Sequence, residues 1–419
     1  MAAPRRCFEA SAHGPGQRPG SEAEQRRAGR HRSERTVIKV TTRVSETDQQ
    51  QRKLADWVPP PGSHGAFWRW SPLLPRGMEF APVSLGEGGT PLLRSRRWQG
   101  VWWKDEGRNP TGSHKDRALS LAAAEARAAG ARHLAVVSAG STGLSCAAYA
   151  ARAGLSAIVL FAVGTAAHRL VPLRALGATL VEVAADIDTA IAALTALDGL
   201  HGVRVASTTR SANAVQAVAG RTIAFEIVAD LGRSPDRIIV PVGGGGTIAA
   251  IHDGFLQLRE MGVVDRLPRL IAVVPETYDT LARAFKEGTP DNSFFSLPQP
   301  TGGPTILNKL AHDHPPDGLH ALAALRESGG RVLTVSDREA VEAVARMGAA
   351  EGMFVEPSSA VALVALERLA GEDGLDSGTT VALACGHGFR EMAVLDPDAR
   401  AHHRVKPNDL EALLAGLGS

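Results

Sequence analysis

The sequence contains only three cysteines, and their spacing argues against two kinds of site. Cys7, Cys146 and Cys385 lie too far apart to form the CxxC pairs typical of zinc and redox-disulfide sites. Because so little cysteine suits a reducing compartment, we expect a cytoplasmic protein. The HExxH zinc motif and the Gly-x-Ser-x-Gly nucleophile elbow are also absent, so the sequence predicts neither a metalloprotease nor an α/β-hydrolase.

Long apolar runs and an excess of one charge are missing as well. No run reaches the roughly 18 apolar residues that a membrane helix needs, so we expect no membrane partner. The formal net charge is +2 over 419 residues, which gives no reason to expect a nucleic-acid partner. The arginine-rich residues 1–50 lack the apolar core of a secretory signal and are expected to form a disordered leader. A targeting or nucleic-acid-binding arm is the alternative interpretation of this segment.

Short apolar runs alternate with alanine-rich segments of helical length after Lys115. The runs predict strands at residues 133–138, 156–162, 178–184, 202–207, 237–242, 269–275, 331–336 and 379–385, and GVWWK (100–104) is a further candidate. The intervening segments predict helices that include residues 143–153, 213–231, 247–261, 337–351 and 358–370. Continuous apolar strands separated by helices indicate parallel sheets that are covered on both faces.

The distribution of these strands predicts an α/β protein with two lobes and a cleft between them. Four strands precede residue 208 and four follow residue 236, so each lobe is expected to contain a largely parallel sheet covered by helices. We expect a large domain from residues 51–125 and 213–400, with a smaller domain inserted at 126–212. Residues 401–419 are expected to form a C-terminal helix or tail.

The run PVGGGGTIAA (241–250) follows a strong strand and leads into a helix. Consecutive glycines let the backbone approach a ligand closely, and N–H groups at a helix N-terminus bind anions. The run therefore predicts a phosphate site. Gly244, Gly246 and Ala249 also fit the G-x-G-x-x-A dinucleotide fingerprint. That fingerprint expects an acidic residue about 20 positions further on, but the acidic residue at the end of the next strand, Glu276, lies some thirty positions on. An NAD(P)-binding protein remains an alternative.

Lys115 follows the turn-forming NPTG (109–112) and opens a helical run. The helix dipole makes an ammonium ion unfavourable there, and Arg108 and Arg117 are expected to add repulsion. Both effects, together with burial, would favour the neutral amine that a Schiff base requires. A phosphate site plus an activated lysine predicts pyridoxal 5′-phosphate (PLP), which has one phosphate and one aldehyde. A solvent-facing Lys-Asp-Arg helix start is the alternative.

Five segments, in this order, resemble the tryptophan-synthase-like (fold type II) PLP enzymes, and threonine synthase most of all. They are NPTGSHKDRA (109–118), SAGSTGLSCAAYAARAG (138–154), PVGGGG (241–246), EPSSAVALVAL (356–366) and CGHGFRE (385–391). The resemblance implies a homodimer that binds PLP between two lobes. It also implies a lyase that acts on an amino acid with a β- or γ-leaving group. For threonine synthase, the reaction converts O-phosphohomoserine and water into threonine and phosphate.

The resemblance also implies roles for individual residues. Lys115 would hold PLP as a Schiff base and serve as general base, and Cys385 would face the pyridine nitrogen. The cofactor phosphate would be bound by Gly243, Gly244, Gly245, Gly246 and Thr247. The substrate carboxylate would be bound by Ser138, Ala139, Gly140, Ser141 and Thr142, of which Ser141 would also lie beside the cofactor.

Three departures from the family pattern leave the substrate open. Ser141 stands where the family usually has asparagine, and His114 stands where phenylalanine is common. We interpret His114 as a packing substitution, with a proton carrier as the alternative. In segment 207–222, Gln216 stands near an expected arginine, for which Arg210 or Arg221 could compensate.

The alternatives to threonine synthase are a serine/threonine dehydratase, a β-replacing synthase of specialised metabolism and a non-catalytic descendant of the family. Away from the motifs, Glu226 and Asp253 are expected on solvated faces of helices.

Overall fold

The computed structural model describes residues 57–58, 66–75, 78–185, 187–207, 209–372, 375, 378–395, 406–407 and 414. All of them belong to one compact unit, Glu46–Ser419. The predicted leader and most of the predicted C-terminal tail lie outside the described residues. Within the described ranges, none of the helices has the length and apolar character needed to cross a membrane.

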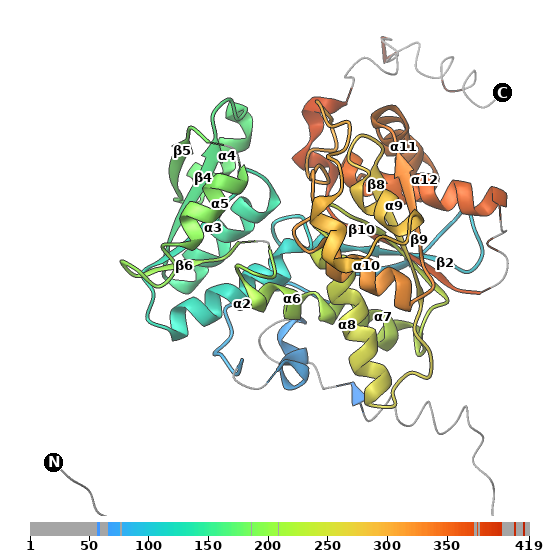
Figure 1. Cartoon of the computed structure of the whole chain (residues 1–419), viewed down its shortest axis with the longest axis horizontal. Helices are drawn as coiled ribbons and strands as arrows, with labels where there is room; N and C mark the ends of the chain where they lie inside the picture. Colours follow the sequence, from blue (N-terminus) through green and yellow to red (C-terminus); the bar gives the residue numbers. More distant parts are fainter. Residues whose placement is uncertain are drawn as a thin grey trace, which may run out of the picture. The chain divides into compact units, whose positions relative to one another are not determined.

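The strands of the described chain form two sheets, which Figure 1 shows at the right and left of the molecule. The larger sheet has the order β1-β2-β10-β7-β8-β9, with strands Leu92–Arg94, Val101–Asp105, Thr380–Ala384, Arg237–Pro241, Arg269–Pro275 and Arg331–Val335. The smaller sheet has the order β5-β4-β3-β6, with strands Thr179–Val183, Ser156–Ala162, His133–Val137 and Val203–Val205. Every described strand pair is parallel except β1–β2. The predicted α/β class with two largely parallel sheets is confirmed.

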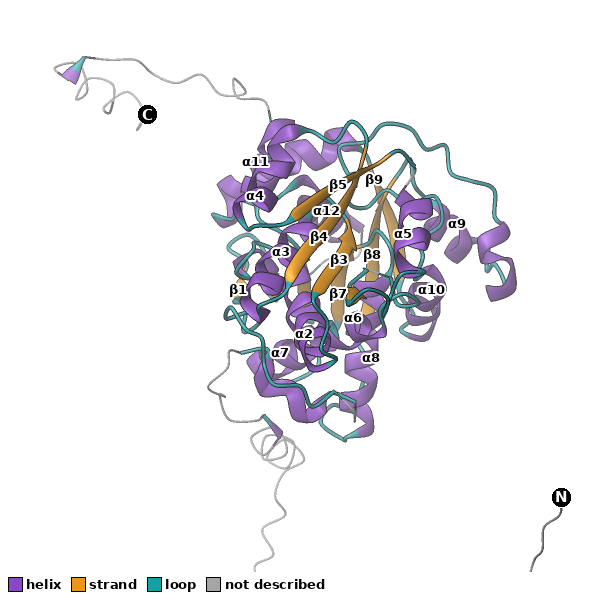
Figure 2. Ribbon diagram, turned by 90° about the vertical axis from the view of Figure 1, so that its left-hand side faces the viewer, coloured by secondary structure: helices purple, strands orange, loops and turns teal. Residues whose placement is uncertain are grey.

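Helices surround both sheets, as Figure 2 shows. The α-helices are α2 (Lys115–Ala128), α3 (Ser141–Ala153), α4 (Ala167–Ala175), α5 (Ile187–Thr195), α6 (Ala214–Ala219), α7 (Arg221–Leu231), α8 (Gly246–Glu260), α9 (Thr280–Lys286), α10 (Gly318–Glu327), α11 (Asp337–Glu351) and α12 (Pro357–Glu372). Short 3₁₀ helices lie at Trp68–Leu73, Glu106–Arg108, Asp291–Ser296, Gly388–Arg390 and Met392–Val394.

Burial on both faces explains why the strands of the larger sheet are apolar throughout. In β7, Ile238 and Val240 pack into one core cluster and Ile239 into another, and β8 divides its residues in the same way. Successive side chains of a strand point to opposite faces, so helices on both sides require an apolar residue at every position. This continuous pattern makes these strands easy to recognise in the sequence.

All eight predicted strands are present, with ends within two residues of those predicted. The helix predicted at residues 213–231 is wrong, because the chain forms two helices, α6 and α7, that meet at Gly220. The Thr222 hydroxyl donates to the Ala219 carbonyl there, a side-chain bond that competes with regular helix bonding. Gly220 also lies so close to α8 that an added Cβ would be 2.6 Å from the Cβ of Ala250. The predicted domain boundaries stay a prediction.

Candidate active site

The turn before Lys115 is closed by its own polar groups. The Gly112 N–H donates to the Asn109 carbonyl at 2.8 Å. The Asp116 carboxylate, in the first turn of α2, accepts from the Thr111 backbone N–H at 2.6 Å and from the Thr111 hydroxyl. The turn is therefore tied to the helix that it precedes, which fixes where the Lys115 side chain starts.

Backbone hydrogen bonds attach this turn to the segment that follows β10. The His114 N–H donates to the Cys385 carbonyl at 3.1 Å, and the His387 N–H donates to the Gly112 carbonyl at 3.0 Å. Ser113 and Gly386 form a β-bridge between these two contacts. Lys115 is thus placed at the carboxyl end of a parallel strand, where ligands of open α/β sheets bind.

Burial lowers the pKa of Lys115, and Cys385 and the Asp317 carboxylate oppose this shift only in part. The predicted preference for the neutral amine is therefore supported, but the predicted repulsion from two arginines is wrong. Arg108 pairs with Asp105 at 3.1 Å, and Arg117 is neutralised elsewhere.

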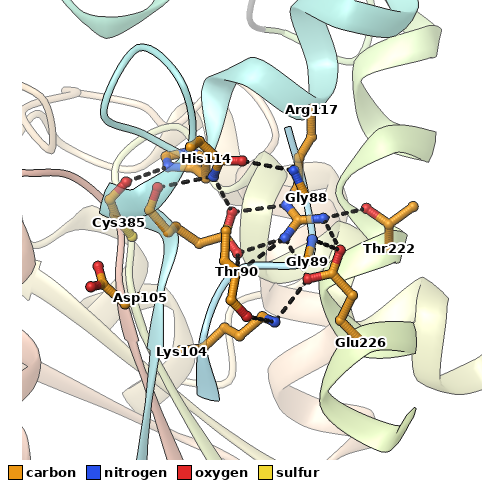
Figure 3. A network of polar contacts seen from close by, with 12 residues as sticks. Gly88, Gly89, Thr90, Lys104, Asp105, His114, Arg117, Thr222, Glu226 and Cys385 are labelled. Carbon is orange, nitrogen blue, oxygen red and sulfur yellow. Dashed lines mark hydrogen bonds and ion pairs between the residues drawn. The ribbon is translucent and has the colours of Figure 1, made fainter. Parts of the chain in front are cut away.

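Arg117 lies at the centre of a buried network of four charged side chains (Figure 3). Its guanidinium bonds to Glu106 at 2.8 Å and to Glu226 at 2.6 Å. Lys104 pairs with the same Glu226 at 2.8 Å, so two positive and two negative charges balance. The predicted solvated position of Glu226 is wrong, because its side chain is 5% exposed. An isolated glutamate in a helical sequence gives no sign of a partner from another helix.

One cavity of about 620 Å³ brings together all twelve predicted site residues. Lys115 and Cys385 line it, together with the oligoglycine segment (Gly243, Gly244, Gly245, Gly246 and Thr247) and the 138–142 loop (Ser138, Ala139, Gly140, Ser141 and Thr142). These residues come from α2, from the end of β10, and from the turns that follow β7 and β3. Both sheets therefore contribute to the cavity.

Comparison with known proteins agrees with this geometry. Residues 83–386 match the family of pyridoxal-phosphate dependent enzymes. The chain belongs to this family. It is 34% identical over 381 residues to a threonine synthase of Methanocaldococcus jannaschii, covering 89% of this chain and 88% of the relative. It is also 33% identical over 375 residues to a threonine synthase of Synechocystis sp., covering 85% and 93%.

Two solved structures share the fold. An O-ureido-L-serine synthase has a TM-score of 0.61 and 23% identity, covering 78% of this chain and 96% of its own. An L-serine ammonia-lyase of Rhizomucor miehei has the same TM-score and identity, covering 74% and 96%. At this identity the likeness concerns the fold alone.

The oligoglycine segment fits the phosphate of PLP. Helix α8 has no side-chain cap at its N-terminus, so its first-turn N–H groups face the cavity without a competing side chain. Gly245 has φ of +91°, and an added Cβ would lie 2.8 Å from the Asp317 carbonyl oxygen. An added Cβ on Gly243 would lie 2.6 Å from the Lys309 carbonyl oxygen. Only glycines allow this backbone to pass between the cavity and residues 309–317.

Replacing Gly245 with alanine is expected to raise the dissociation constant of PLP at least about tenfold. The variant combines a left-handed backbone with a backbone clash, which costs about 1–3 kcal/mol at such positions. Equilibrium dialysis of the full-length protein measures the change. Gly348→Ala is the matched control, because a Cβ there meets no atom within 4 Å. Equal affinity in the two variants would contradict the role of this backbone.

The 138–142 loop is also shaped by a glycine, at the position that follows it. An added Cβ on Gly143 would lie 1.9 Å from the Ser138 carbonyl oxygen, so the loop folds directly over the helix start. The Ser138 hydroxyl accepts from the Gly140 N–H at 3.1 Å, and no side chain caps α3. The first-turn N–H groups of α3 thus form a second anion-binding helix start in the same cavity.

Cys385 reaches the cavity as a neutral thiol, because burial raises the pKa of its side chain. The next residue, Gly386, is bound to helix α12, because its N–H donates to the Ser359 hydroxyl at 2.8 Å. This contact explains why the EPSSA and CGHG strings occur together, since one supports the other.

Sequence reasoning missed five charged residues that line the cavity, namely Arg169, Lys309, Asp317, Glu356 and Glu391. Lys309 pairs with Glu356 and, at 3.0 Å, with Glu391, which Arg169 contacts at 2.9 Å from α4. The EPSSA and CGHGFRE strings contain Glu356 and Glu391 and could have suggested them. No sequence signal marks the other three.

The two arginines of segment 207–222 that could compensate for the missing arginine lie differently with respect to the cavity. Arg210 lines the cavity, but its guanidinium pairs with Asp253 at 3.1 Å. Arg221 approaches the same carboxylate at 3.7 Å and does not line the cavity. Asp253 is therefore half-buried in an ion pair, not on a solvated face as predicted. The side chain of Gln216 lies outside the described residues.

Proposed function

We propose that this PLP-dependent enzyme is a lyase of the threonine synthase type, which converts O-phosphohomoserine and water into threonine and phosphate. The observation that carries the proposal is a buried lysine, Lys115, in one cavity with two uncapped helix N-termini, where burial lowers the pKa of its amine. Similarity to threonine synthases over nearly nine-tenths of the chain supports the choice of reaction.

The proposed roles of the residues are those that the family resemblance implies, and the position of these residues in one cavity supports them. Lys115 would hold the cofactor covalently, and the oligoglycine segment would bind its phosphate. When bound, PLP supplies an electron sink that stabilises negative charge on the substrate carbons. The neutral Cys385 thiol would leave the pyridine nitrogen unprotonated, which suits elimination and replacement at the β- or γ-carbon. The 138–142 loop would bind the substrate carboxylate, with Ser141 beside the cofactor.

Lys115 would also move the protons of the reaction. Its neutral amine would accept the proton from the α-carbon of the substrate as general base. Its ammonium form would return protons to the substrate at later steps. Phosphate leaves the γ-carbon and water adds at the β-carbon, so the overall change consumes one water and releases one phosphate.

The phosphate of the substrate requires cationic partners, and three line the cavity: Arg169, Arg210 and Lys309. Each is paired with a carboxylate in the structure. We infer that an incoming phosphate group would compete with these carboxylates for the same donors. The pairs restrict the cationic side chains before the substrate arrives, which lowers the entropy lost when the substrate binds.

The proposal predicts that the full-length protein with PLP releases phosphate from O-phosphohomoserine and forms threonine in equal amount. A colorimetric phosphate assay combined with chromatographic detection of threonine measures both products. O-phosphoserine, which is one methylene shorter, is the control substrate. Absence of phosphate release, together with formation of a keto acid from serine or threonine, would reject the proposal in favour of a dehydratase.

One observation favours this second function, a serine/threonine dehydratase or a β-replacing synthase. Of the two arginines in segment 207–222, Arg221 lies near Asp253 and does not line the cavity, so the segment offers one arginine at most to a substrate phosphate. A dehydratase substrate carries no phosphate and needs no such donor.

The proposal also includes a homodimer that acts in the cytoplasm on a small amino-acid substrate. Its two domains would be those predicted from the sequence, 51–125 with 213–400 and 126–212. The basis is the resemblance to fold type II enzymes. The dinucleotide alternative has lost its support, because the family uses PLP.

A further inference from the structure

His114, which precedes Lys115, bonds to both ends of the candidate cofactor site. Its Nδ1 lies 3.3 Å from the Cys385 carbonyl oxygen, a contact visible in Figure 3. Its Nε2 lies 3.3 Å from the Thr247 hydroxyl oxygen, in the first turn of α8. The imidazole thus connects the residue proposed at the pyridine end with the residue proposed at the phosphate end. A phenylalanine, common here in the resembling family, could make neither contact.

The two contacts determine which nitrogen carries the hydrogen. A backbone carbonyl can only accept, so Nδ1 of His114 must be the donor to Cys385. Burial lowers the pKa of His114 to about 3, so the ring is neutral and has only one N–H. Nε2 is therefore an acceptor, and the Thr247 hydroxyl donates to it.

The Thr247 hydroxyl has a single hydrogen, so a bond to His114 leaves none for another acceptor. Thr247 nevertheless lines the cavity beside the oligoglycine segment, where the cofactor phosphate is expected. The remaining donors at this helix start are backbone N–H groups, since no side chain caps α8.

We propose that His114 is a positioning residue that holds the Thr247 hydroxyl and withholds its proton from the cofactor phosphate. The phosphate is then bound by the backbone of the oligoglycine segment alone. Removing the imidazole releases the hydroxyl, which can then donate to the phosphate. The inference rests on PLP binding and not on the substrate, so it does not depend on which amino acid the enzyme converts.

Double-mutant analysis of PLP binding tests this inference in the full-length protein. Thr247→Val is compared in the wild-type background and in the His114→Phe background, with dissociation constants measured by equilibrium dialysis. We expect Thr247→Val to weaken binding by less than about twofold in the wild-type background. In the His114→Phe background we expect about tenfold, the effect of losing one hydrogen bond to a charged group.

Two further variants separate hydrogen bonding from packing. His114→Gln keeps a carbonyl oxygen that can accept from Thr247, so the small effect of Thr247→Val should return in that background. Thr247→Ser keeps the hydroxyl and should bind PLP like threonine in every background. His114→Leu provides a second apolar background if phenylalanine prevents folding.

A spectroscopic measurement gives an independent result. The ³¹P resonance of bound PLP should shift between the wild type and His114→Phe, and return toward the wild-type position in His114→Gln. An equal effect of Thr247→Val in both backgrounds, or a larger effect in the wild type, would overturn the inference, as would an unchanged ³¹P resonance. Failure to release phosphate from O-phosphohomoserine would not affect these measurements, so the two proposals fail separately.

Discussion

Replacement of Lys115 by alanine is expected to reduce turnover by at least about a thousandfold while the protein stays folded. The variant would lose both the proposed covalent attachment of PLP and the proposed general base, and a general base alone contributes about 10²–10⁴-fold. Lys115 lies in the first turn of α2 and lines the cavity, so alanine removes an amine without opening a buried core. The visible absorbance of the lysine-bound cofactor should also disappear.

Borohydride trapping gives the experiment its sharpest readout. Reduction of the wild-type protein with PLP should fix the cofactor on the peptide that contains Lys115, as identified by mass spectrometry. Lys286→Ala is the matched control, because that lysine is exposed on α9 and should change neither turnover nor trapping. An adduct on another lysine, or turnover that survives in Lys115→Ala, would remove the basis of the proposed mechanism.

Much of the fold could be predicted because its strands carry a local signal. Strands β7 and β8 are buried on both faces, so the sequence itself shows an unbroken apolar run. Strand β1 was missed because it is three residues long, with Leu93 and Arg94 exposed, and is recognisable only through its antiparallel pairing with β2. The break at Gly220 was missed because it depends on close packing against α8, which no local pattern records.

The residues of the candidate site also fall into those that could be predicted from the sequence and those that could not. Lys115 and the oligoglycine segment could be predicted because each belongs to one continuous motif whose chemistry is local. The ion pairs that join Arg169 and Lys309 to Glu391 could not be predicted, because the three side chains are brought together from α4 and from two loops far apart in the sequence. A sequence shows which side chains exist, but the residues that complete a cavity are determined by the tertiary fold.

Glu226 is the clearest example of a residue whose partners are determined by the tertiary fold. Its replacement by alanine is expected to lower the free energy of unfolding by about 3–5 kcal/mol. Removing one partner of a buried ion pair leaves the other charges without compensation, a cost of this size. Here Arg117 and Lys104 would each lose a carboxylate, and both are at most 1% exposed. The Gly89 N–H would also lose its acceptor. Urea unfolding at pH 7 measures the change.

Glu342→Ala is the matched control for this prediction. Glu342 pairs with Arg338 at 3.4 Å on the surface of α11, with side chains 50% and 80% exposed. A surface pair of this kind contributes about 0–1 kcal/mol, so the control should unfold almost like the wild type. Similar destabilisation by the two substitutions would show that the buried network adds nothing beyond an ordinary surface ion pair.

The destabilisation caused by Glu226→Ala should also depend on pH in a defined direction. Burial by itself raises the pKa of Glu226, but the charges of Arg117 and Lys104 outweigh it and hold that pKa well below the ordinary 4.5. A depressed pKa stabilises the folded state above the unfolded-state value and loses this effect as the pH falls. The difference between wild type and variant should therefore be constant near neutrality and narrow below about pH 4.5. The same network fixes Arg117, two residues after Lys115 in α2. Acid that protonates Glu226 should therefore loosen the attachment of α2 and lower the stability of the fold together.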